Sequence, residues 1–297
     1  DWLVFGHHQD DQAETLLFRL LRGSGVRGAA AMTVVDPPCT ARPGRLRPLL
    51  DCSRSTIEAW ARDRGLAWVE DESNARLDFS RNHLRHRVLP VIGERFPAAT
   101  ATLARAAEHF REASVLLDEL AALDQSACGG QPLQHERVLA LSDARVANLL
   151  RWLVRQDDFR APSRWRLAEA LRQLRAVPAS HPLRIELGDM ACCAYRGQLW
   201  LEPTALEALL PQHWSGSDTV RWGAGAVHFL PRPGEGIARA VLDSAGEVVL
   251  STRRPGLRMC VGVGRPRRSF KKLCQEADIP AWLRDRLPVL WVDGEPA

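Results

Sequence analysis

The chain has 297 residues, of which 45% are hydrophobic and 26% are charged, and its formal net charge is +4. This is ordinary globular composition, and the length predicts two or three domains. No apolar run approaches the roughly 20 residues of a membrane span, so an integral membrane protein is not indicated. Seven cysteines occur without a C-x-x-C pair. That argues against a zinc ribbon or a dithiol redox site and is typical of free thiols in a reducing, cytosolic protein.

The first residues predict a strand followed by a helix. Residues 2–5 form a short apolar run typical of a buried parallel strand, and Gly6 ends it. Apolar residues then recur with the spacing of one helical face from Ala13 to Leu21, and Gly23 stands where a helix-ending glycine is expected.

Polar groups that can bind ligands or transfer protons gather at this junction between strand and helix. They are two imidazoles, three carboxylates and a glycine-serine turn: His7, His8, Asp10, Asp11, Glu14 and Gly23-Ser24-Gly25. Open α/β sheets hold ligands beyond the carboxyl ends of their strands. Carboxylates suit Mg²⁺, and backbone N–H groups suit phosphates, so the combination favours a site that handles ATP. Taken singly, each feature also fits a helix cap or a plain loop.

The motif His8-x-Asp10-Asp11-Gln12-x-Glu14-Thr15, followed by Arg22-Gly23-Ser24-Gly25, resembles the tRNA(Ile)-lysidine synthetases. These are N-type ATP pyrophosphatases of the PP-loop family. They join lysine to C2 of the wobble cytidine of tRNA(Ile) with a CAU anticodon, through an adenylated cytidine. The resemblance implies ATP and Mg²⁺ as cofactors. It also implies these roles: catalysis by His8, Asp10, Asp11 and Glu14; phosphate binding by Arg22, Gly23, Ser24 and Gly25; Mg²⁺ binding by Asp10 and Asp11.

A second group of candidate residues follows the next predicted helix and strand. We expect a helix from Ser53 to Arg64, with Ser55 as cap and Glu58 completing a capping box, and a strand over residues 66–69. Residues 70–74 then resemble the family's E-D-x-[ST]-N element. The resemblance implies that the cationic lysine substrate is held there by three residues: Asp71, Glu72 and Asn74.

The run that begins at Arg81 resembles the family's R-N-x-x-R element. Arg81 and Arg85 are one helical turn apart and could face a phosphate together, so we expect Arg81, Asn82 and Arg85 to contact the tRNA or the adenylated intermediate. A solvated acidic loop followed by a basic helix start is the alternative. The position of both runs after the first motif favours the functional interpretation.

The remaining chain predicts a helical segment and then a small mixed one. A long amphipathic helix covers residues 97–123, and Gly129-Gly130 ends it. Two further helices are expected at 141–156 and 163–177, then a hairpin of strands at 183–187 and 191–200. Residues 252–295 resemble the family's C-terminal domain. We expect these basic residues to contact tRNA phosphates: Arg164, Arg268, Lys271 and Lys272. Ordinary charged surface helices are the alternative.

One family element is missing from the printed sequence. The glycine-rich S-G-G-x-D-S loop has no counterpart, because Ser215–Thr219 lacks the second glycine and reads as a linker turn. We therefore expect an N-terminally truncated chain, clipped at its C-terminus too, with ATP hydrolysis by this polypeptide in doubt. A non-catalytic tRNA-binding fragment is one alternative. Another PP-loop ATPase modifying RNA is the second, and the match of residues 252–295 argues against it.

The expected architecture is α/β in three parts. Residues 1–98 form an ATP-pyrophosphatase domain with a partial parallel sheet, residues 99–205 a helical linker and tRNA substrate-binding domain, and residues 206–297 a small α+β tRNA-binding domain. The expected activity is ligation, with tRNA(Ile) and L-lysine as partners. We expect a cytoplasmic protein without a membrane partner, and a homodimer is a further expectation.

Overall fold

The computed structural model describes residues 1–38, 42–69, 76–157, 159–178, 181–205, 208–223, 225–234, 236–260 and 266–297. The chain divides into two compact units, residues 1–124 and 125–297, and each is described by itself. The three-part division at residues 98 and 205 stays a prediction. Within the described ranges, each helix is too short or too polar to cross a lipid bilayer.

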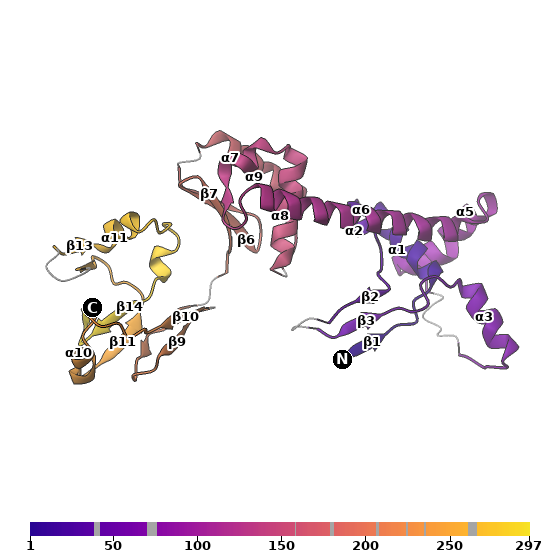
Figure 1. Ribbon diagram of the computed structural model, residues 1–297. Helices are drawn as coiled ribbons and strands as arrows, with labels where there is room; N and C mark the ends of the chain where they lie inside the picture. Colours follow the sequence, from indigo (N-terminus) through magenta and orange to yellow (C-terminus); the bar gives the residue numbers. More distant parts are fainter. Residues whose placement is uncertain are drawn as a thin grey trace. The chain divides into compact units, whose positions relative to one another are not determined.

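The first unit contains a small mixed sheet in the order β1-β3-β2 (Figure 1). Strand β1 (Trp2–Val4) runs parallel to β3 (Gly44–Leu46), and β2 (Val35–Asp36) runs antiparallel to β3. The predicted parallel strand is confirmed, but its predicted burial is wrong: the side chains of β1 are 49 to 66% exposed. Its side chains point to the two faces of the sheet, and the described residues leave both faces partly uncovered there.

The predicted first helix is confirmed as α1 (Gln9–Leu21), and Gly23 follows it with φ of +74°. Helix α3 (Arg54–Asp63) also forms, but Ser53 caps it instead of Ser55. The Ser53 hydroxyl accepts the backbone N–H of Thr56 at 3.1 Å, which places the helix start two residues earlier than the capping-box spacing indicated.

The predicted strand over residues 66–69 is wrong, because this segment has no regular structure. Its apolar side chains are largely exposed, with Val69 at 95%. A short apolar run becomes a strand only where a neighbouring strand accepts its backbone hydrogen bonds, and no described strand pairs with this one.

Helical segments complete the first unit. They are α2 (Val26–Ala29), α4 (Ser80–His83), the π-helical turn η2 (Leu84–Val88), α5 (Leu89–Arg95) and α6 (Ala99–Ala127). The predicted amphipathic helix is thus confirmed as α6. Its apolar face carries Ala107 and Phe110, which pack with Leu16 of α1 and Ala29 of α2. This packing holds α1, whose first turn carries the candidate site, against the rest of the unit.

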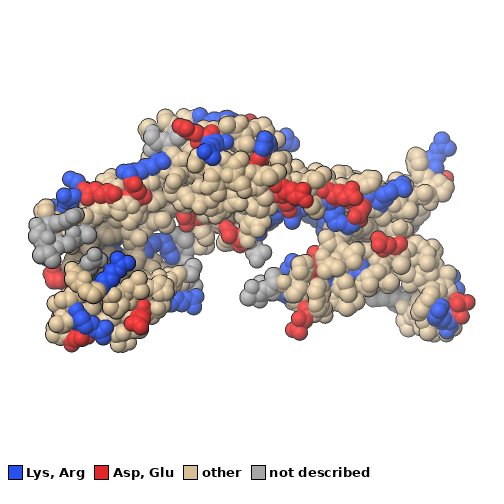
Figure 2. All heavy atoms as spheres, viewed as in Figure 1, with Lys and Arg blue, Asp and Glu red and all other residues tan. Residues whose placement is uncertain are grey.

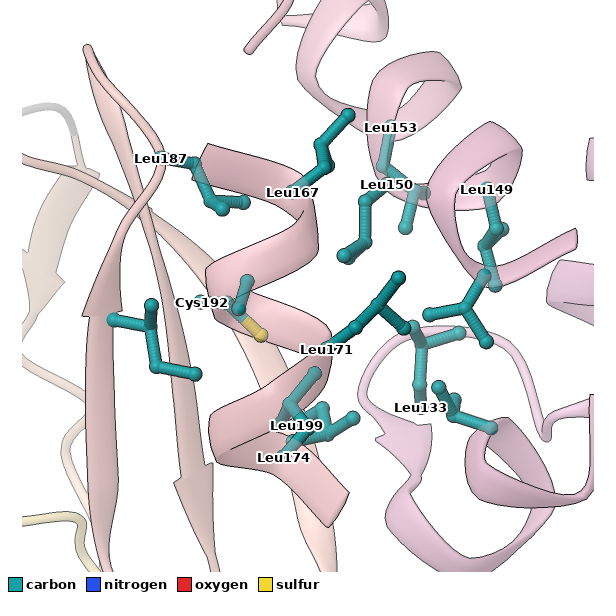
Figure 3. Close-up of a cluster of buried hydrophobic side chains, with 14 of the residues drawn as sticks. Leu133, Leu149, Leu150, Leu153, Leu167, Leu171, Leu174, Leu187, Cys192 and Leu199 are labelled. Atoms are coloured by element: carbon teal, nitrogen blue, oxygen red, sulfur yellow. The ribbon is translucent and has the colours of Figure 1, made fainter. Parts of the chain in front are cut away.

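The second unit begins with a helical layer against a sheet. The helices are α7 (His135–Ala140), α8 (Asp143–Gln156) and α9 (Arg164–Ala176). The sheet has the order β4-β7-β6-β5, formed by β4 (Leu133–Gln134), β5 (Leu183–Glu186), β6 (Met190–Tyr195) and β7 (Gln198–Pro203). Leucines of α8 and α9 point toward the inner face of the sheet and form the largest buried cluster (Figure 3).

The predicted hairpin in this unit has one strand more than expected. Residues 191–200 bend back on themselves between β6 and β7, where Arg196 and Gly197 have φ of 47° and 77°. Two consecutive residues in the left-handed region are typical of a type I′ hairpin turn. The apolar run on both sides of the turn conceals it in the sequence.

The last part of the chain is a small α+β arrangement, as predicted. Its main sheet has the order β15-β14-β11-β8, formed by β8 (Gln212–His213), β11 (Val248–Ser251), β14 (Val289–Val292) and β15 (Glu295–Pro296). Two strand pairs accompany it: β9 (Thr219–Trp222) with β10 (Gly225–His228), and β12 (Arg258–Met259) with β13 (Arg268–Ser269). The helical segments are α10 (Arg239–Ser244), α11 (Phe270–Glu276) and the 3₁₀ turn η3 (Arg284–Arg286).

Candidate functional site

The candidate site is built on the first turn of α1, where His8 is the capping residue. His8 has an extended backbone and forms a parallel bridge to Leu49. Its backbone N–H donates to Oδ2 of Asp11 at 3.0 Å. Asp11 is the third residue of the helix, so its carboxylate satisfies the backbone donor at the cap, as in a capping box. The sequence motif therefore starts the helix as well as supplying polar groups.

Asp10 joins this helix start to the next helix. Its Oδ2 accepts the backbone N–H of Arg54 at 2.8 Å and lies 3.6 Å from Nδ1 of His8. The His8 side chain beside it is the largest cause that lowers the pKa of Asp10 from its usual 3.8. The Asp10 side chain is 33% exposed, so the site presents an ionised carboxylate to solvent at neutral pH.

Asp11 and Glu14 pair with the two arginines of the R-N-x-x-R element (a set called the carboxylate–arginine cluster below). Arg85 donates from Nε to Oε1 of Glu14 at 2.6 Å and from Nη2 to Oε2 at 2.9 Å, a bidentate contact. Arg85 Nη2 also reaches Oδ1 of Asp11 at 2.9 Å. Arg81 donates to the same two carboxylates, each at 3.1 Å.

This cluster balances two carboxylates with two guanidinium groups. Glu14 is 1% exposed, so its charge depends on the arginines for stabilisation. The bond to Glu14 is the largest cause that raises the pKa of Arg85. Residues three and four positions apart share a helical face, which explains why both members of each pair meet. The family resemblance implies catalysis by the two carboxylates and a tRNA or intermediate contact by the two arginines. In the structure the four side chains pair with one another.

The surroundings of His7 favour its uncharged form. Burial lowers the pKa of His7 below 6.5, and Arg81, Arg47 and His8 act in the same direction, while Asp11 opposes them. The ring stacks on Phe5 with centroids 5.4 Å apart. An uncharged imidazole is therefore favoured here at neutral pH.

The predicted phosphate-binding turn forms, but much of its backbone is already paired. The N–H of Gly23 donates to the carbonyl of Leu20, and that of Ser24 to the carbonyl of Arg19. Gly25 precedes the four-residue helix α2. The Arg22 guanidinium lies over the Phe18 ring, 5.1 Å from its centroid. Phosphate binding by Arg22, Gly23, Ser24 and Gly25 stays a prediction.

The described residues bear on the predicted metal site but not on the predicted lysine site. Across the described ranges, no group of three His, Cys, Asp or Glu side chains is arranged to hold a metal ion. The Asp11 carboxylate is occupied by the cap and the arginines. The three lysine-site residues lie outside the described ranges: Asp71, Glu72 and Asn74. Asn82 donates from Nδ2 to the carbonyl of Arg76 at 2.8 Å and so anchors its own turn.

Sequence reasoning missed two side chains that support the site. Arg47 is 7% exposed and donates to the carbonyl of Thr33 and to Asp36. Gln12 pairs both ends of its amide with the backbone of Met32, at 2.8 and 2.9 Å. In the sequence, these two side chains are only a glutamine and an arginine within polar motifs. Neither residue type identifies its partner.

In the second unit, some of the predicted tRNA-binding residues form ion pairs, whereas others are exposed to solvent. Arg268 donates to both oxygens of Glu276 at 2.8 Å. Lys271 and Lys272 are exposed on the first turn of α11. On α9, Arg164 is exposed beside Trp165. Burial lowers the pKa of the nearby Arg151, and the charge of Arg164 lowers it further. Excess positive charge next to an exposed aromatic ring suits RNA.

Comparisons with known proteins agree with this arrangement. Residues 1–92 match a family model described as a PP-loop domain, residues 133–200 the TilS substrate binding domain, and residues 248–297 the TilS substrate C-terminal domain. The whole chain is 59% identical over 300 residues to a tRNA(Ile)-lysidine synthase of Aromatoleum aromaticum and 58% identical over 297 residues to one of Azoarcus sp.. A Nitrosomonas europaea relative of the same name is 38% identical over 304 residues, or 99% of this chain.

The chain spans 69, 65 and 66% of the lengths of these three relatives. The three matched segments stand in the order of an ATP-binding domain followed by two substrate domains. From its sequence, its fold and these relatives, the chain belongs to the tRNA(Ile)-lysidine synthase family.

Proposed function

We propose that this protein joins L-lysine to C2 of the wobble cytidine of tRNA(Ile) with a CAU anticodon, at the expense of ATP. The 59% identity to a named synthase over the entire chain is the observation that carries the proposal. In the first step the cytidine oxygen attacks the α-phosphate of ATP, and pyrophosphate leaves. In the second, the lysine amine attacks C2, and AMP leaves.

The residues at the start of α1 suit proton handling in the second step. The lysine ammonium must lose a proton before it can act as a nucleophile. His8 Nδ1 is buried without a hydrogen-bond partner and lies 3.6 Å from the Asp10 carboxylate. We assign His8 as the proton acceptor, because the carboxylates of Asp10 and Asp11 lie 3.6 and 3.5 Å from its two ring nitrogens and would stabilise the imidazolium that forms.

Mg²⁺ would neutralise the phosphates of ATP during adenylation. The residues present fit one protein ligand better than two. Asp10 is ionised and partly exposed, whereas the Asp11 oxygens already accept three donors from His8, Arg81 and Arg85. In such sites Mg²⁺ usually binds few carboxylates, and substrate phosphate oxygens and water complete its coordination. We therefore propose Asp10, and not Asp11, as its protein ligand.

The other contacts are proposals of the same kind. Lysine would be held by the carboxylates of Asp71 and Glu72, with Asn74 ordering their loop. The tRNA backbone would meet Arg164, Lys271 and Lys272, whereas Arg268 would first have to leave Glu276. A cytoplasmic location and a homodimer complete the proposal.

The proposal is tested by ATP-dependent incorporation of labelled lysine into tRNA(Ile) by the protein expressed from its own gene. We expect incorporation into the CAU tRNA and none into a tRNA(Ile) whose wobble base is not cytidine, with AMP as a product. Transfer of a different group to RNA would assign the protein to another PP-loop reaction, and tRNA binding without transfer would favour a non-catalytic role.

A substitution tests the lysine site directly. Asp71→Asn should raise the KM for lysine more than that for ATP, because losing one charge-assisted hydrogen bond costs about 1.5–3 kcal/mol. Asp63→Asn, at the exposed end of α3, is the matched control. Equal changes in both KM values would assign the acidic loop to folding.

A further inference from the structure

A second polar cavity lies in the first unit, outside the carboxylate–arginine cluster. It has a volume of about 460 Å³, is open on one side, and is lined by residues of α1, α2, the sheet and the middle of α6. Five arginines line it: Arg19, Arg27, Arg45, Arg47 and Arg111. The only acidic side chains in its lining are Asp36 and Asp118, so positive charge is in excess. Arginine atoms lie beside acidic ones along α6 in Figure 2.

The arginines divide into those that build the cavity and those that face its space. Arg19 clamps α2 by donating to the carbonyls of Gly28 and Ala31 at 2.9 and 2.8 Å. Arg27 reaches across to Asp118 of α6 at 2.7 Å. Arg45 is exposed on β3, and Arg111 pairs along its own helix with Glu108. The latter two can therefore turn toward a ligand without loss of a contact between elements.

Arg47 supplies an independent sign that the cavity accepts a ligand. It is 7% exposed, and its Nε is buried without a hydrogen-bond partner. A buried charged donor left unsatisfied is costly, and a bound anion would satisfy it. Arginine is suited to phosphate, because its planar donors match the phosphate oxygens.

We propose that this arginine cavity binds a backbone phosphate of the tRNA. The choice of RNA as the source rests on the proposed function, while the phosphate chemistry rests on the cavity alone. The cavity is also linked to the start of α1: the Arg47 guanidinium lies 5.6 Å from the Phe5 ring centroid, and Phe5 stacks on His7. Arg47 therefore connects the cavity to the segment that leads into α1.

The test compares two double variants of the full chain with equal loss of charge. Arg45→Gln with Arg111→Gln removes the two adaptable cavity arginines. Arg62→Gln with Arg64→Gln removes two exposed arginines of α3 and its end, away from the cavity. The affinity for tRNA is measured from 50 to 200 mM salt, and circular dichroism checks that both variants fold.

We expect the cavity variant to bind tRNA more weakly and its log–log salt slope to fall by about 0.7–0.9, the contribution of one phosphate. The control slope should not change. Equal slopes in the two variants would overturn the proposal. So would stabilisation by inorganic pyrophosphate that depends on Arg45 and Arg111 while the tRNA slope is unchanged, since the cavity would then take a free phosphate.

These outcomes are separable from the proposed activity. Lysine incorporation with no change in slope refutes the cavity proposal and leaves the function standing. A lower slope without any lysine incorporation supports the cavity proposal and refutes the proposed function.

Discussion

Replacing Glu14 with glutamine is the most direct perturbation of the carboxylate–arginine cluster. The variant keeps the shape of a side chain that is 1% exposed, but it removes the charge that accepts three hydrogen bonds from Arg81 and Arg85. Two guanidinium groups are then left with Asp11 alone. Breaking a fully buried ion pair costs about 3–5 kcal/mol. Because the arginine side chains are 42 and 21% exposed, water recovers part of this, and we expect about 2–3 kcal/mol.

Native-state hydrogen exchange is the appropriate assay, because a chain with two units need not unfold in one transition. Amides in the middle of α1 should exchange roughly 30- to 150-fold faster in Glu14→Gln, since each 1.4 kcal/mol is a factor of ten. Glu58→Gln is the matched control, because Glu58 also accepts from two arginines, Arg54 and Arg62, but on the surface of α3. Equal exchange of α1 in both variants would refute the inference that the cluster stabilises this helix.

Three further predictions concern other positions. Burial lowers the pKa of His7, so the unfolded chain binds more protons just below pH 6.5; the stability of the first unit should fall as pH drops from 7.5 to 5.5, and His7→Gln should flatten that dependence in pH-jump unfolding. Gly28→Ala would place a Cβ 2.6 Å from the Ser24 Cβ and should cost about 1–3 kcal/mol, whereas Gly93→Ala, with open space around it, should not destabilise the protein in urea melts. Burial raises the pKa of Cys192 to about 12, so iodoacetamide at pH 8 should label the exposed Cys260 and spare Cys192 until the protein is unfolded, as peptide mass spectrometry would show.

Local signals in the sequence predicted the longer helices, whereas short ones such as α2 and α5 were missed. Asp10 and Asp11 in the first turn and the left-handed Gly23 indicated where α1 begins and ends. Helix α6 was predictable because its apolar stripe repeats over many turns. The segment over residues 66–69 was not, because a strand depends on a partner that a local pattern cannot specify.

The candidate site shows the same division. Its carboxylates and arginines were predictable as candidates, because they form two distinct motifs in the sequence. Their pairing was not, because Glu14 and Arg85 are 71 positions apart. The support given by Arg47 was missed for the same reason. Of its two partners, Asp36 lies on β2 and Thr33 lies in the segment before that strand.

Whether the cluster serves stability, substrate binding or both can be decided by a double-mutant cycle. Glu14→Gln and Arg85→Gln each leave a charge without its partner, whereas the double variant leaves neither, so the two costs should not add. We expect a coupling free energy of about 1–3 kcal/mol from α1 exchange rates. The cycle is then repeated with saturating ATP and Mg²⁺. If Arg85 moves to a phosphate during turnover, the coupling falls when ATP is bound, because Arg85 has exchanged Glu14 for the ligand. An unchanged coupling would fix Arg85 as a structural residue, and costs that add to within about 0.5 kcal/mol without ATP would show that the bidentate pair contributes nothing of its own.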